Sequence, residues 1–301
     1  MRIGVSLTSA HRTSDLRATA RFMIERAAAA RRADLDSLFL GDHHATDQPY
    51  YQNTPMLGRL LAEWGDKPAG CLFLLPMWNP VLLAEQVGTL AAIARGRFIL
   101  QCGLGEGEAQ FRAMGTHLEQ RVPAFEESLG IVRRLLAGEV VSSTGRFVFE
   151  DARVALRPVE PVEVWIGASA APAIARAARL GDGWLAAPGI GVDEAARQLA
   201  HYRERCRAHG RTPSAIAIRR DVYVAASKAD AEAVAGPIVS RGYRGFGPDA
   251  PVAGTVDDVV ERFRALGALG YTDVIIRHLT DDQPAVLASM ARLADVRKAL
   301  A

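Results

Sequence analysis

The sequence predicts an α/β fold in which eight parallel strands and their helices close into a (β/α)8 TIM barrel, as one domain over residues 1–301. Apolar runs of strand length alternate along the chain with amphipathic stretches of helix length. The runs are apolar at nearly every position, which indicates strands buried on both faces, as in a parallel sheet covered by helices. Because the chain holds eight such units, closure into a barrel is favoured over an open, doubly wound sheet.

Each strand is expected in a short apolar run, and a helix is expected in the amphipathic stretch that follows it. The expected strands lie at 2–7, 37–42, 69–76, 97–103, 162–168, 182–187, 216–227 and 272–278. The expected helices lie at 16–33, 55–64, 80–94, 121–137, 171–181, 193–208, 228–240, 255–270 and 284–300. Thr255 precedes acidic residues as a typical N-cap, and Gly181 ends its helix as a C-cap. A dinucleotide-binding fold would need a Gly-rich loop after the first strand, and residues 6–11 supply none.

Two segments interrupt this alternation. Residues 140–160 alternate in polarity like a short hairpin, so an excursion from the barrel is predicted there. Residues 241–254 are rich in Gly and Pro, which predicts a loop insertion.

Composition and charge exclude several classes of function. The formal net charge is +2, and the basic residues are interleaved with alanine and acids, so neither nucleic acid nor a membrane surface is expected as a partner. No apolar run approaches the roughly 20 residues of a membrane span, and the N-terminus is too short and polar for a signal peptide. The three scattered cysteines form neither a disulfide framework nor a CxxC metal motif. A cytoplasmic protein is therefore expected.

The second strand ends in a histidine pair that is the first candidate for chemistry, because barrels of this kind carry their sites at the C-terminal strand ends. Since adjacent residues of an extended chain point to opposite sides, only one of His43 and His44 can face the barrel axis. This argues against a metal held by both, and no third ligand has a helpful spacing. One histidine acting as a base or hydrogen-bond partner is favoured, and a loop histidine without a role is the alternative.

Three further side chains lie at expected strand ends. Trp78 follows the third strand between two prolines, and either lines a pocket at the mouth or packs under a loop. Glu106 lies in a Gly-rich segment after the fourth strand, and is either a proton donor or a solvated acid. Arg277 ends the eighth strand and is expected to face the mouth.

The fifth strand ends in small residues, 167–170, that run into a helix. Free backbone N–H groups at a helix N-terminus bind phosphate, and Ser169 can add its hydroxyl. The alternative is that Ser169 only caps the helix. Arg121, which opens the helix after the fourth strand, supplies a counter-charge or is simply a surface arginine.

With these residues in place, the chain resembles the bacterial luciferase-like flavin monooxygenase superfamily, which also contains reductases and dehydrogenases that use the deazaflavin coenzyme F420. The resemblance covers about residues 1–280 and rests on the order and spacing of its motifs. They are DHH at 42–44, LPMWNPVLLAEQVGTLAAIARGRF at 75–98, CGLGEGEAQFRAMG at 102–115, Arg121 with FEESLGIVRRLLAGE at 125–139, WIGAS at 165–169, AARLGDGW at 177–184 and GTVDDVVERFRALGALGYTDVIIR at 254–277.

The resemblance implies that a flavin-type ring lies over the barrel mouth with His43 beside it, in proton transfer or orientation. It implies a phosphate site after the fifth strand, formed by Arg121 and the backbone of Gly167, Ala168, Ser169 and Ala170, whereas barrels in general use their last two loops. It also implies coenzyme contacts at Cys71, Leu72 and Gly103, with a cis peptide bond between the first two, and substrate contacts at His44, Trp78 and Arg277.

The sequence also departs from the family pattern. The reactive cysteine of the luciferase itself matches Gly103, with Cys102 one place away, so a cysteine role is not supported. Glu106 matches an acid that donates a proton in some deazaflavin dehydrogenases.

Three functions follow from the resemblance. The first is a reduced-FMN-dependent monooxygenase, supplied by a separate flavin reductase, that oxygenates a small organic substrate in an apolar mouth around Trp78, Leu7 and Phe111. The second is an F420-dependent reductase or dehydrogenase, with His43 or Glu106 as acid or base. The third is a non-catalytic flavin-binding barrel. A homodimer or homotetramer is expected, as is frequent in the family.

Overall fold

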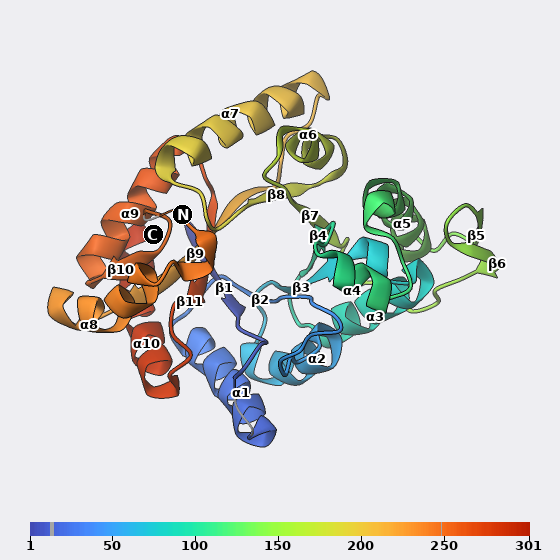
Figure 1. Cartoon of the computed structure of the whole chain (residues 1–301). Helices are drawn as coiled ribbons and strands as arrows, with labels where there is room; N and C mark the ends of the chain where they lie inside the picture. The colour runs from blue at the N-terminus through green and yellow to red at the C-terminus, as the bar shows by residue number, and fades with distance from the viewer. Residues whose placement is uncertain (13–14, 248) are drawn as a thin grey trace.

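Eight parallel strands close into a barrel in the computed structural model, which describes residues 1–12, 15–247 and 249–301 (Figure 1). Around the barrel the strands follow one another in chain order, and the last pairs with the first. The barrel strands are β1 (Arg2–Leu7), β2 (Ser37–Leu40), β3 (Ala69–Leu74), β4 (Phe98–Gly103), β7 (Glu163–Gly167), β8 (Gly183–Ala186), β9 (Ala215–Val224) and β11 (Asp273–His278). The predicted (β/α)8 fold is confirmed, strand by strand.

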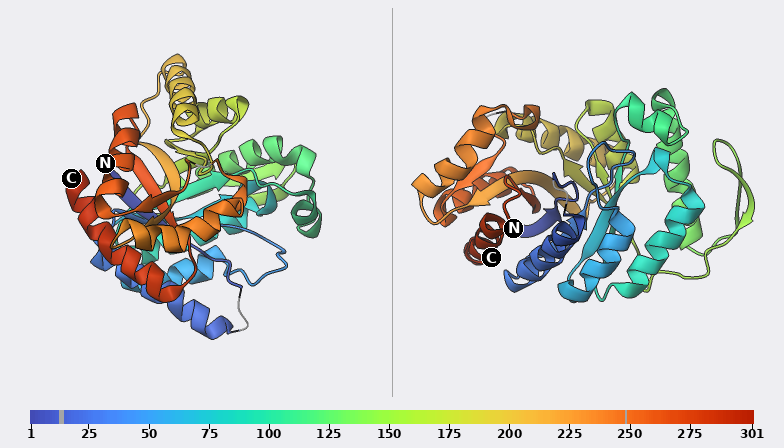
Figure 2. Two further views of the ribbon diagram at one scale, coloured as in Figure 1. Left: turned by 60° about the vertical axis from the view of Figure 1, so that its left-hand side comes forward. Right: turned by 60° about the horizontal axis from the view of Figure 1, so that its bottom comes forward.

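Helices surround the barrel on its outside (Figures 1 and 2). They are α1 (Leu16–Arg32), α2 (Asn53–Trp64), α3 (Pro80–Ile93), α5 (Arg121–Leu136), α6 (Ala171–Leu180), α7 (Val192–Ala208), α8 (Lys228–Ser240), α9 (Val256–Leu269) and α10 (Gln283–Leu300). Thr255 caps α9 in a capping box with Asp258, as its sequence predicts. The short helix α4 (Glu108–Ala113) and the 3₁₀ turns η1 (Leu75–Met77), η2 (Leu118–Gln120) and η3 (Tyr243–Gly245) were not predicted, because one or two turns carry no readable periodicity.

The excursion predicted at 140–160 is an antiparallel hairpin, β5 (Val141–Thr144) and β6 (Val148–Ala152). It stands away from the barrel beside α5 (Figures 1 and 2). Glu127 of α5 tethers it by accepting hydrogen bonds from the Arg146 amide at 3.0 Å and the Ser143 hydroxyl at 3.3 Å. The hairpin is therefore an appendage of α5 rather than part of the barrel wall.

The predicted loop insertion at 241–254 is wrong at its end, where residues 252–254 form the short strand β10 (Val252–Gly254). β10 pairs with residues 222–224 of β9, beyond the part of β9 that pairs with β8. Val252 is buried, so an apolar residue and a free strand edge explain the pairing. Residue 248 of this predicted loop lies outside the described residues.

The core has two layers, as expected for strands buried on both faces. Inside the barrel, Phe39, Ile99, Trp165 and Ile275 pack together with small residues of β9. A larger cluster fills the space between the barrel and the helices, and it includes Cys71. Burial raises the pKa of the Cys71 thiol well above its usual value, so this side chain has no thiolate chemistry to offer.

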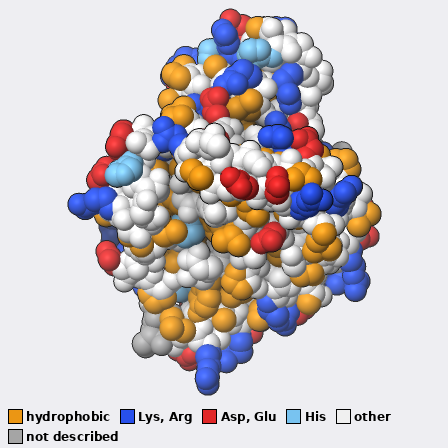
Figure 3. Space-filling view, turned by 90° about the vertical axis from the view of Figure 1, so that its right-hand side faces the viewer, with side chains coloured by type: hydrophobic (Ala, Val, Ile, Leu, Met, Phe, Trp, Pro, Cys, Tyr) orange, Lys and Arg blue, Asp and Glu red, His pale blue; other side chains and the backbone are white. Residues whose placement is uncertain are grey.

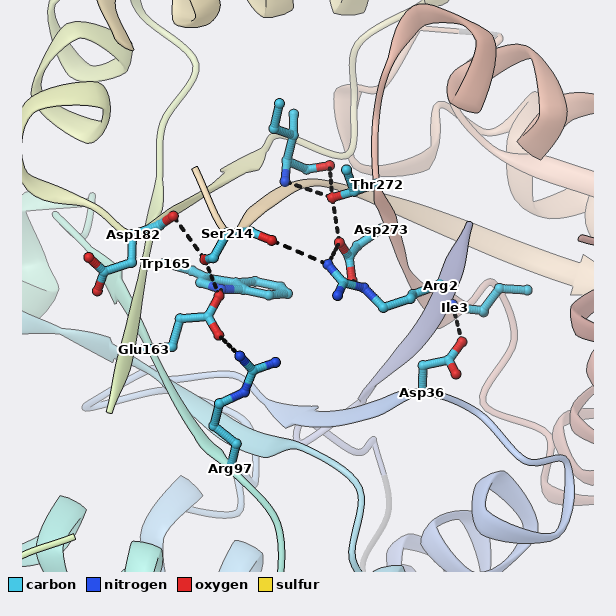
Figure 4. Close-up of polar contacts among 11 residues, drawn as sticks. Arg2, Ile3, Asp36, Arg97, Glu163, Trp165, Asp182, Ser214, Thr272 and Asp273 are labelled. Atoms are coloured by element: carbon cyan, nitrogen blue, oxygen red, sulfur yellow. Dashed lines mark hydrogen bonds and ion pairs between the residues drawn. The ribbon is translucent and has the colours of Figure 1, made fainter. Parts of the chain in front are cut away.

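Polar side chains close the barrel at the N-terminal ends of its strands (Figure 4). Arg2 donates two hydrogen bonds of 2.7 Å to the carboxylate of Asp273. Glu163 accepts a hydrogen bond from Trp165 Nε1 at 2.7 Å and from the Ser214 hydroxyl, and its second oxygen pairs with Arg97 at 2.9 Å. Residues far apart in the chain thus meet in one connected network at this end.

The surface of the molecule is mixed in character on the side that carries α5 and the hairpin. Figure 3 shows basic and acidic side chains interspersed there, with hydrophobic side chains gathered in its lower half. Across the described residues, no helix is both long and apolar enough to cross a membrane.

Candidate functional site

The two adjacent histidines after β2 face different surroundings, as the extended backbone predicts. His43 is exposed, whereas His44 is buried with its Nε2 3.2 Å from Asp42 Oδ1. His43 is therefore the histidine that a bound ligand can reach at the mouth. His44, which was expected to contact substrate, is instead largely enclosed in the wall.

Asp42 holds this part of the wall together. Its Oδ2 accepts hydrogen bonds of 2.8 Å from the backbone amide of Leu74 and from Trp78 Nε1. The Trp78 ring also packs edge-on against His44 and Phe73, with centroids 5.5 and 5.1 Å apart. Trp78 is only partly buried, so it packs under the loop and still leaves part of its ring accessible.

Tyr50 and Arg277 share the space above Gly41, at the end of β2. A Cβ atom placed on Gly41 would lie 2.9 Å from Tyr50 Oη and 3.5 Å from Arg277 Nη2, so a glycine is needed there. The His43 ring lies beside Tyr50, with centroids 5.9 Å apart. Burial raises the pKa of Tyr50 to about 12, so its hydroxyl stays protonated at neutral pH. The structure thus brings His43 and Arg277 together around Tyr50.

Arg277 carries a positive charge without a carboxylate hydrogen-bonded to it. Its Nη2 donates to Ser6 Oγ at 3.0 Å, and its buried Nε finds no hydrogen-bond partner among the described residues. Burial, and then the charge of Arg219, lower the pKa of Arg277 to about 10, so the guanidinium is still charged at neutral pH.

The nearby charges of β9 are, by contrast, paired with each other. Arg219 donates two hydrogen bonds of 2.8 Å to Asp221, whose carboxylate also accepts from the Tyr243 hydroxyl at 2.6 Å. Burial opposes ionisation, but the Arg219 guanidinium prevails and holds the pKa of Asp221 below its usual value. Tyr243 belongs to the 241–254 segment, so this segment closes over β9.

The expectation of an apolar mouth around Trp78, Leu7 and Phe111 is wrong. Leu7 is 2% exposed and packs in the layer between barrel and helices, while Phe111 is fully buried against Leu74 and Met77. The physical reason is strand alternation: Ser6 points into the barrel, so its neighbour Leu7 points outward. The inner face at the mouth therefore carries polar groups such as Ser6 and Arg277, beside partly buried apolar side chains such as Trp78.

Glu106 lies exposed in the turn between β4 and α4. Gly105 and Gly107 flank it with φ of +76° and +84°, a backbone region that favours glycine. The buried side chain of Gln110 connects this turn to the histidine loop, because its Oε1 accepts from the His44 amide at 2.8 Å and its Nε2 donates to the Glu106 carbonyl at 3.1 Å. The loops of the two catalytic candidates, His43 and Glu106, are therefore joined.

The start of α6 has the features expected of a phosphate site. Ala170 is the N-cap residue and makes no side-chain capping bond, and Pro172 lacks an N–H group. Within the described chain, the amides of Ser169 and Ala170 donate no backbone hydrogen bond outside regular elements. The Ala168 carbonyl accepts from Trp184 Nε1 at 2.8 Å, which fixes the loop. Free amides on a fixed loop fit an anion.

Two arginines lie near this helix start, one of them unforeseen. Arg121 is half-buried, and its Nη1 donates to the Leu118 carbonyl at 3.1 Å. Arg176 of α6 is 8% exposed, lies over the Phe125 ring at 5.6 Å, and has an Nε atom without a partner in the described part of the chain. Burial lowers the pKa of Arg176; the charge of Glu126, which is paired with Arg179, opposes this shift, and the charges of Arg179 and Arg121 add to it. An anion at the start of α6 could pair with the free Arg176 Nε.

The expected coenzyme contacts on β3 and β4 divide between the two faces of the sheet. The Cys71 side chain is fully buried outside the barrel, so only its backbone remains for contact. Leu72 and Gly103 face inward, since a Cβ atom on Gly103 would lie 3.4 Å from Leu72 Cδ1. The expected cis bond between Cys71 and Leu72 is not found, because the described residues contain no cis peptide; β3 pairs with β4 residue by residue through this point.

Several residues of the site were missed by sequence reasoning, namely Tyr50, Gln110, Arg176, Arg219 and Asp221. Only the last two carried a readable signal, since charged residues two places apart in the apolar run of β9 must point to one face. Among the described residues, no group of three or more His, Cys, Asp or Glu side chains is arranged to hold a metal ion.

Comparisons with known proteins bear on this site. A family model described as luciferase-like monooxygenase matches residues 1–250. An F420-dependent glucose-6-phosphate dehydrogenase from Intrasporangium calvum is 31% identical over 192 residues, which are 60% of this chain and 57% of that relative. A protein of the same description from Kineococcus radiotolerans is 26% identical over 272 residues, which are 86% and 79% of the two chains. The chain spans little more than half the length of most of these curated relatives.

Solved structures with the same fold include enzymes of two chemistries. Monooxygenase RslO1 from Streptomyces bottropensis superposes with a TM-score of 0.85 at 19% identity, covering 98% of each chain. An F420-dependent secondary alcohol dehydrogenase, solved with an F420-acetone adduct, has a TM-score of 0.81 at 16% identity and covers 100% of this chain and 99% of its own. At such identities the likeness establishes the fold.

Proposed function

The chain belongs to the luciferase-like monooxygenase family, and on that premise we propose that it is an oxidoreductase that binds a flavin-type coenzyme over the barrel mouth and transfers a hydride to or from a small polar substrate. The resemblance noted in the sequence motifs is thereby confirmed. Within the family, we favour the deazaflavin F420 as the coenzyme. Curated relatives that match at 26–31% identity are described as F420-dependent, which supports this choice.

The observation that carries the proposal is the polar mouth. Arg277 lies there with a buried Nε that has no hydrogen-bond partner among the described residues, so an apolar or aromatic substrate would leave this donor unpaired. An unpaired buried polar group costs about 1–3 kcal/mol, so such a lining disfavours an apolar ligand. A substrate with hydroxyl groups or a negative charge pairs with the Arg277 guanidinium instead. The mouth therefore fits a polar substrate.

The residues around the mouth also fit a flat, phosphorylated ring system. Gly167 leaves open space, since a Cβ atom placed on it would meet only the Cys102 carbonyl oxygen, at 3.6 Å. The free amides at the start of α6, with Arg121 and Arg176, would hold the phosphate. Leu72 and Gly103 would lie beside the ring. These are the positions that the family resemblance assigns to the coenzyme, apart from Arg176.

When bound, an F420-type coenzyme supplies hydride transfer without activating oxygen. The chain's own residues would supply proton transfer and orientation. The exposed His43 ring is placed to take the proton of a substrate hydroxyl as a general base, and the exposed Glu106 carboxylate is the second proton carrier. Arg277 would orient the substrate, and Asp42 would hold Trp78 and the wall in place.

A paired titration and turnover assay tests this proposal. The purified chain is titrated with F420 and with FMN under anaerobic conditions, and turnover is then measured with polar alcohols and sugar phosphates. We expect saturable F420 binding and substrate-dependent F420 reduction. Tight binding of reduced FMN, with oxygen consumption and no turnover with F420, would overturn it.

A reduced-FMN-dependent monooxygenase is the second candidate, favoured by the description of the matching family model. It would require a separate flavin reductase, and the same assay separates it from the first. A non-catalytic flavin-binding barrel predicts instead that His43→Ala leaves any coenzyme-linked activity and its pH dependence unchanged.

Location and assembly remain predictions. Three free, buried cysteines support a reducing, cytoplasmic environment. A homodimer or homotetramer is checked by light scattering of the purified chain.

A further inference from the structure

We infer that Gln110 is a positioning residue that holds the loops of His43 and Glu106 in fixed relation across the barrel mouth. The catalytic part of this inference rests on the proposed function, whereas the contact itself does not. Gln110 is 7% exposed and lies on α4, within the motif at 102–115 but not among the residues that the family resemblance assigns to coenzyme or substrate.

One end of the Gln110 side chain fixes the peptide group between the two histidines. Its Oε1 accepts the buried hydrogen bond from the His44 amide at 2.8 Å. The carbonyl of the same peptide group, that of His43, accepts from Gln52 Nε2 at 3.2 Å in an exposed contact. A peptide group is planar, so the buried bond to its N–H end restrains its rotation and hence the direction of the His43 Cα–Cβ bond, and the exposed contact from Gln52 adds little.

The other end of Gln110 fixes the turn that carries Glu106. Its Nε2 donates to the Glu106 carbonyl at 3.1 Å. That turn contains Gly105 and Gly107 at positive φ, positions where glycine makes many backbone conformations accessible. This bond to the carbonyl between them, together with the backbone bonds that the Gly107 carbonyl accepts from Gln110 and Phe111, restricts an otherwise permissive turn.

The base of Gln110 is itself rigid. The next residue, Phe111, is fully buried and packs against Leu74 and Met77, which anchors α4 to the end of β3. The His44 ring lies beside Asp42, so it leaves the backbone amide of His44 to Gln110. A glutamine is required because its amide offers an acceptor and a donor at once, whereas an ionised glutamate offers only acceptors and leucine offers neither.

Three variants test this role, with wild-type protein as reference: Gln110→Leu, Gln110→Glu and the control Gln52→Leu. The control removes the exposed bond to the same peptide group. We measure kcat and KM with the coenzyme, the coenzyme Kd, the pH dependence of kcat, and hydrogen exchange at the His44 amide. Circular dichroism and thermal unfolding verify that each variant folds.

We expect Gln110→Leu to lower kcat by about ten- to hundredfold, because misplacement by about 1 Å costs rates of that order. The coenzyme Kd should stay within about threefold, since Gln110 lies away from the α6 phosphate site. The His44 amide should lose its exchange protection. Gln110→Glu should keep that protection but lower kcat at neutral pH, and the ratio of its kcat to that of wild type at the same pH should rise at acid pH, where a protonated carboxyl donates to the Glu106 carbonyl again. Gln52→Leu should change kcat by less than about threefold.

Distinct outcomes overturn the inference. Unchanged His44 exchange in Gln110→Leu shows that the contact does not exist in solution. Lost protection with unchanged kcat and pH profile shows that the contact is structural only. If wild-type protein turns over with neither coenzyme, the proposed function fails. The comparison of His44 amide exchange still decides whether Gln110 bonds the His44 amide in solution. If Gln110→Leu does not fold, Gln110→Glu, which keeps the side-chain volume, decides by its pH profile.

Discussion

The two ends of the barrel are built from the same strands but treat polar groups in opposite ways. At the N-terminal end, Arg2, Asp273, Glu163 and Ser214 satisfy one another across strands that are far apart in the chain (Figure 4). At the C-terminal end, Arg277 keeps a buried Nε without a partner in the described structure, and His43 stands exposed.

This difference indicates that the N-terminal end contributes mainly to stability and the C-terminal end mainly to ligand binding and chemistry. A satisfied network stabilises the fold because each buried donor has its acceptor. Unsatisfied groups weaken the fold and become useful when a ligand supplies the missing partner. Mutations at the N-terminal end should therefore change mainly the free energy of unfolding. Mutations at the mouth should change mainly ligand affinity and kcat.

The largest effect is expected at the mouth, from His43→Ala. Loss of a general acid or base lowers kcat by about 10²–10⁴-fold. Because His43 is exposed, the free energy of unfolding should change by no more than about 0.5 kcal/mol. Steady-state kinetics with the coenzyme and urea unfolding measure the two effects. A loss of stability comparable to the loss of rate would break the distinction between the ends.

A second test uses His278, which lies at the mouth end of β11 but points outward toward Arg26 and the helices. Burial lowers its pKa to about 3, with the charge of Arg26 acting in the same direction. Between about pH 6.5 and 3, this histidine is protonated in the unfolded chain, where its pKa is near 6.5, and neutral in the folded protein. The free energy of unfolding therefore falls as pH drops from about 6.5 toward 3. The expected loss between pH 7 and pH 4 is on the order of 3 kcal/mol.

His278→Leu should flatten this acid slope without changing kcat at neutral pH. Part of the slope should remain, because burial also lowers the pKa of His11, which therefore acts with the same sign. Urea unfolding at a series of pH values gives the slope. An unchanged slope would mean that the His278 side chain is hydrated or hydrogen-bonded in solution. The outward direction of a side chain at this end would then not determine whether it affects stability.

At the N-terminal end, Glu163→Ala and Glu163→Gln form a matched pair. Alanine leaves the buried Trp165 Nε1 without its acceptor, which should cost about 1–3 kcal/mol, whereas the Ser214 hydroxyl can still donate to the Asp182 carbonyl at 2.9 Å. Glutamine keeps an acceptor oxygen and loses mainly the pairing with the half-exposed Arg97, which should cost less than about 1 kcal/mol. Thermal unfolding measures both. A change in kcat per folded molecule would show that this end is coupled to the chemistry.

Sequence reasoning found the elements but not the contacts between them. Long periodic segments such as α1 and α9 were predicted because an amphipathic period over many residues is readable in one chain. β10 and α4 were missed because three to six residues carry no period. The apolar mouth was wrong because the inward phase of β1, Ser6 rather than Leu7, depends on its partners in the closed barrel.

For the site too, sequence reasoning predicted residues at strand ends but not the contacts between segments. His43 and the small residues at 167–170 lie at strand ends, so the chain order alone places them at the mouth. The link from Gln110 to both the His44 amide and the Glu106 carbonyl joins two segments of the chain that only the folded molecule brings together. Arg176 was overlooked for a related reason: an arginine in an alanine-rich helix is usually solvated, and its burial against Phe125 is a tertiary effect.

The smallest effect, and the sharpest test of the comparison, is expected from Gly167→Ala. A Cβ atom at this position would meet only the Cys102 carbonyl oxygen, at the ordinary distance of 3.6 Å, so the fold should tolerate it within about 0.5 kcal/mol. The same methyl group would project into the space proposed for the coenzyme, so the coenzyme Kd should rise by about tenfold, or about 1.4 kcal/mol. Gly183→Ala is the matched control at the start of β8, where a Cβ atom would lie 2.7 Å from the Trp165 ring and should cost stability instead. Coenzyme titration and thermal unfolding of both variants compare the effect of one added methyl group at the mouth with that of one at the N-terminal end. An unchanged coenzyme Kd in Gly167→Ala would move the coenzyme away from the fifth barrel strand.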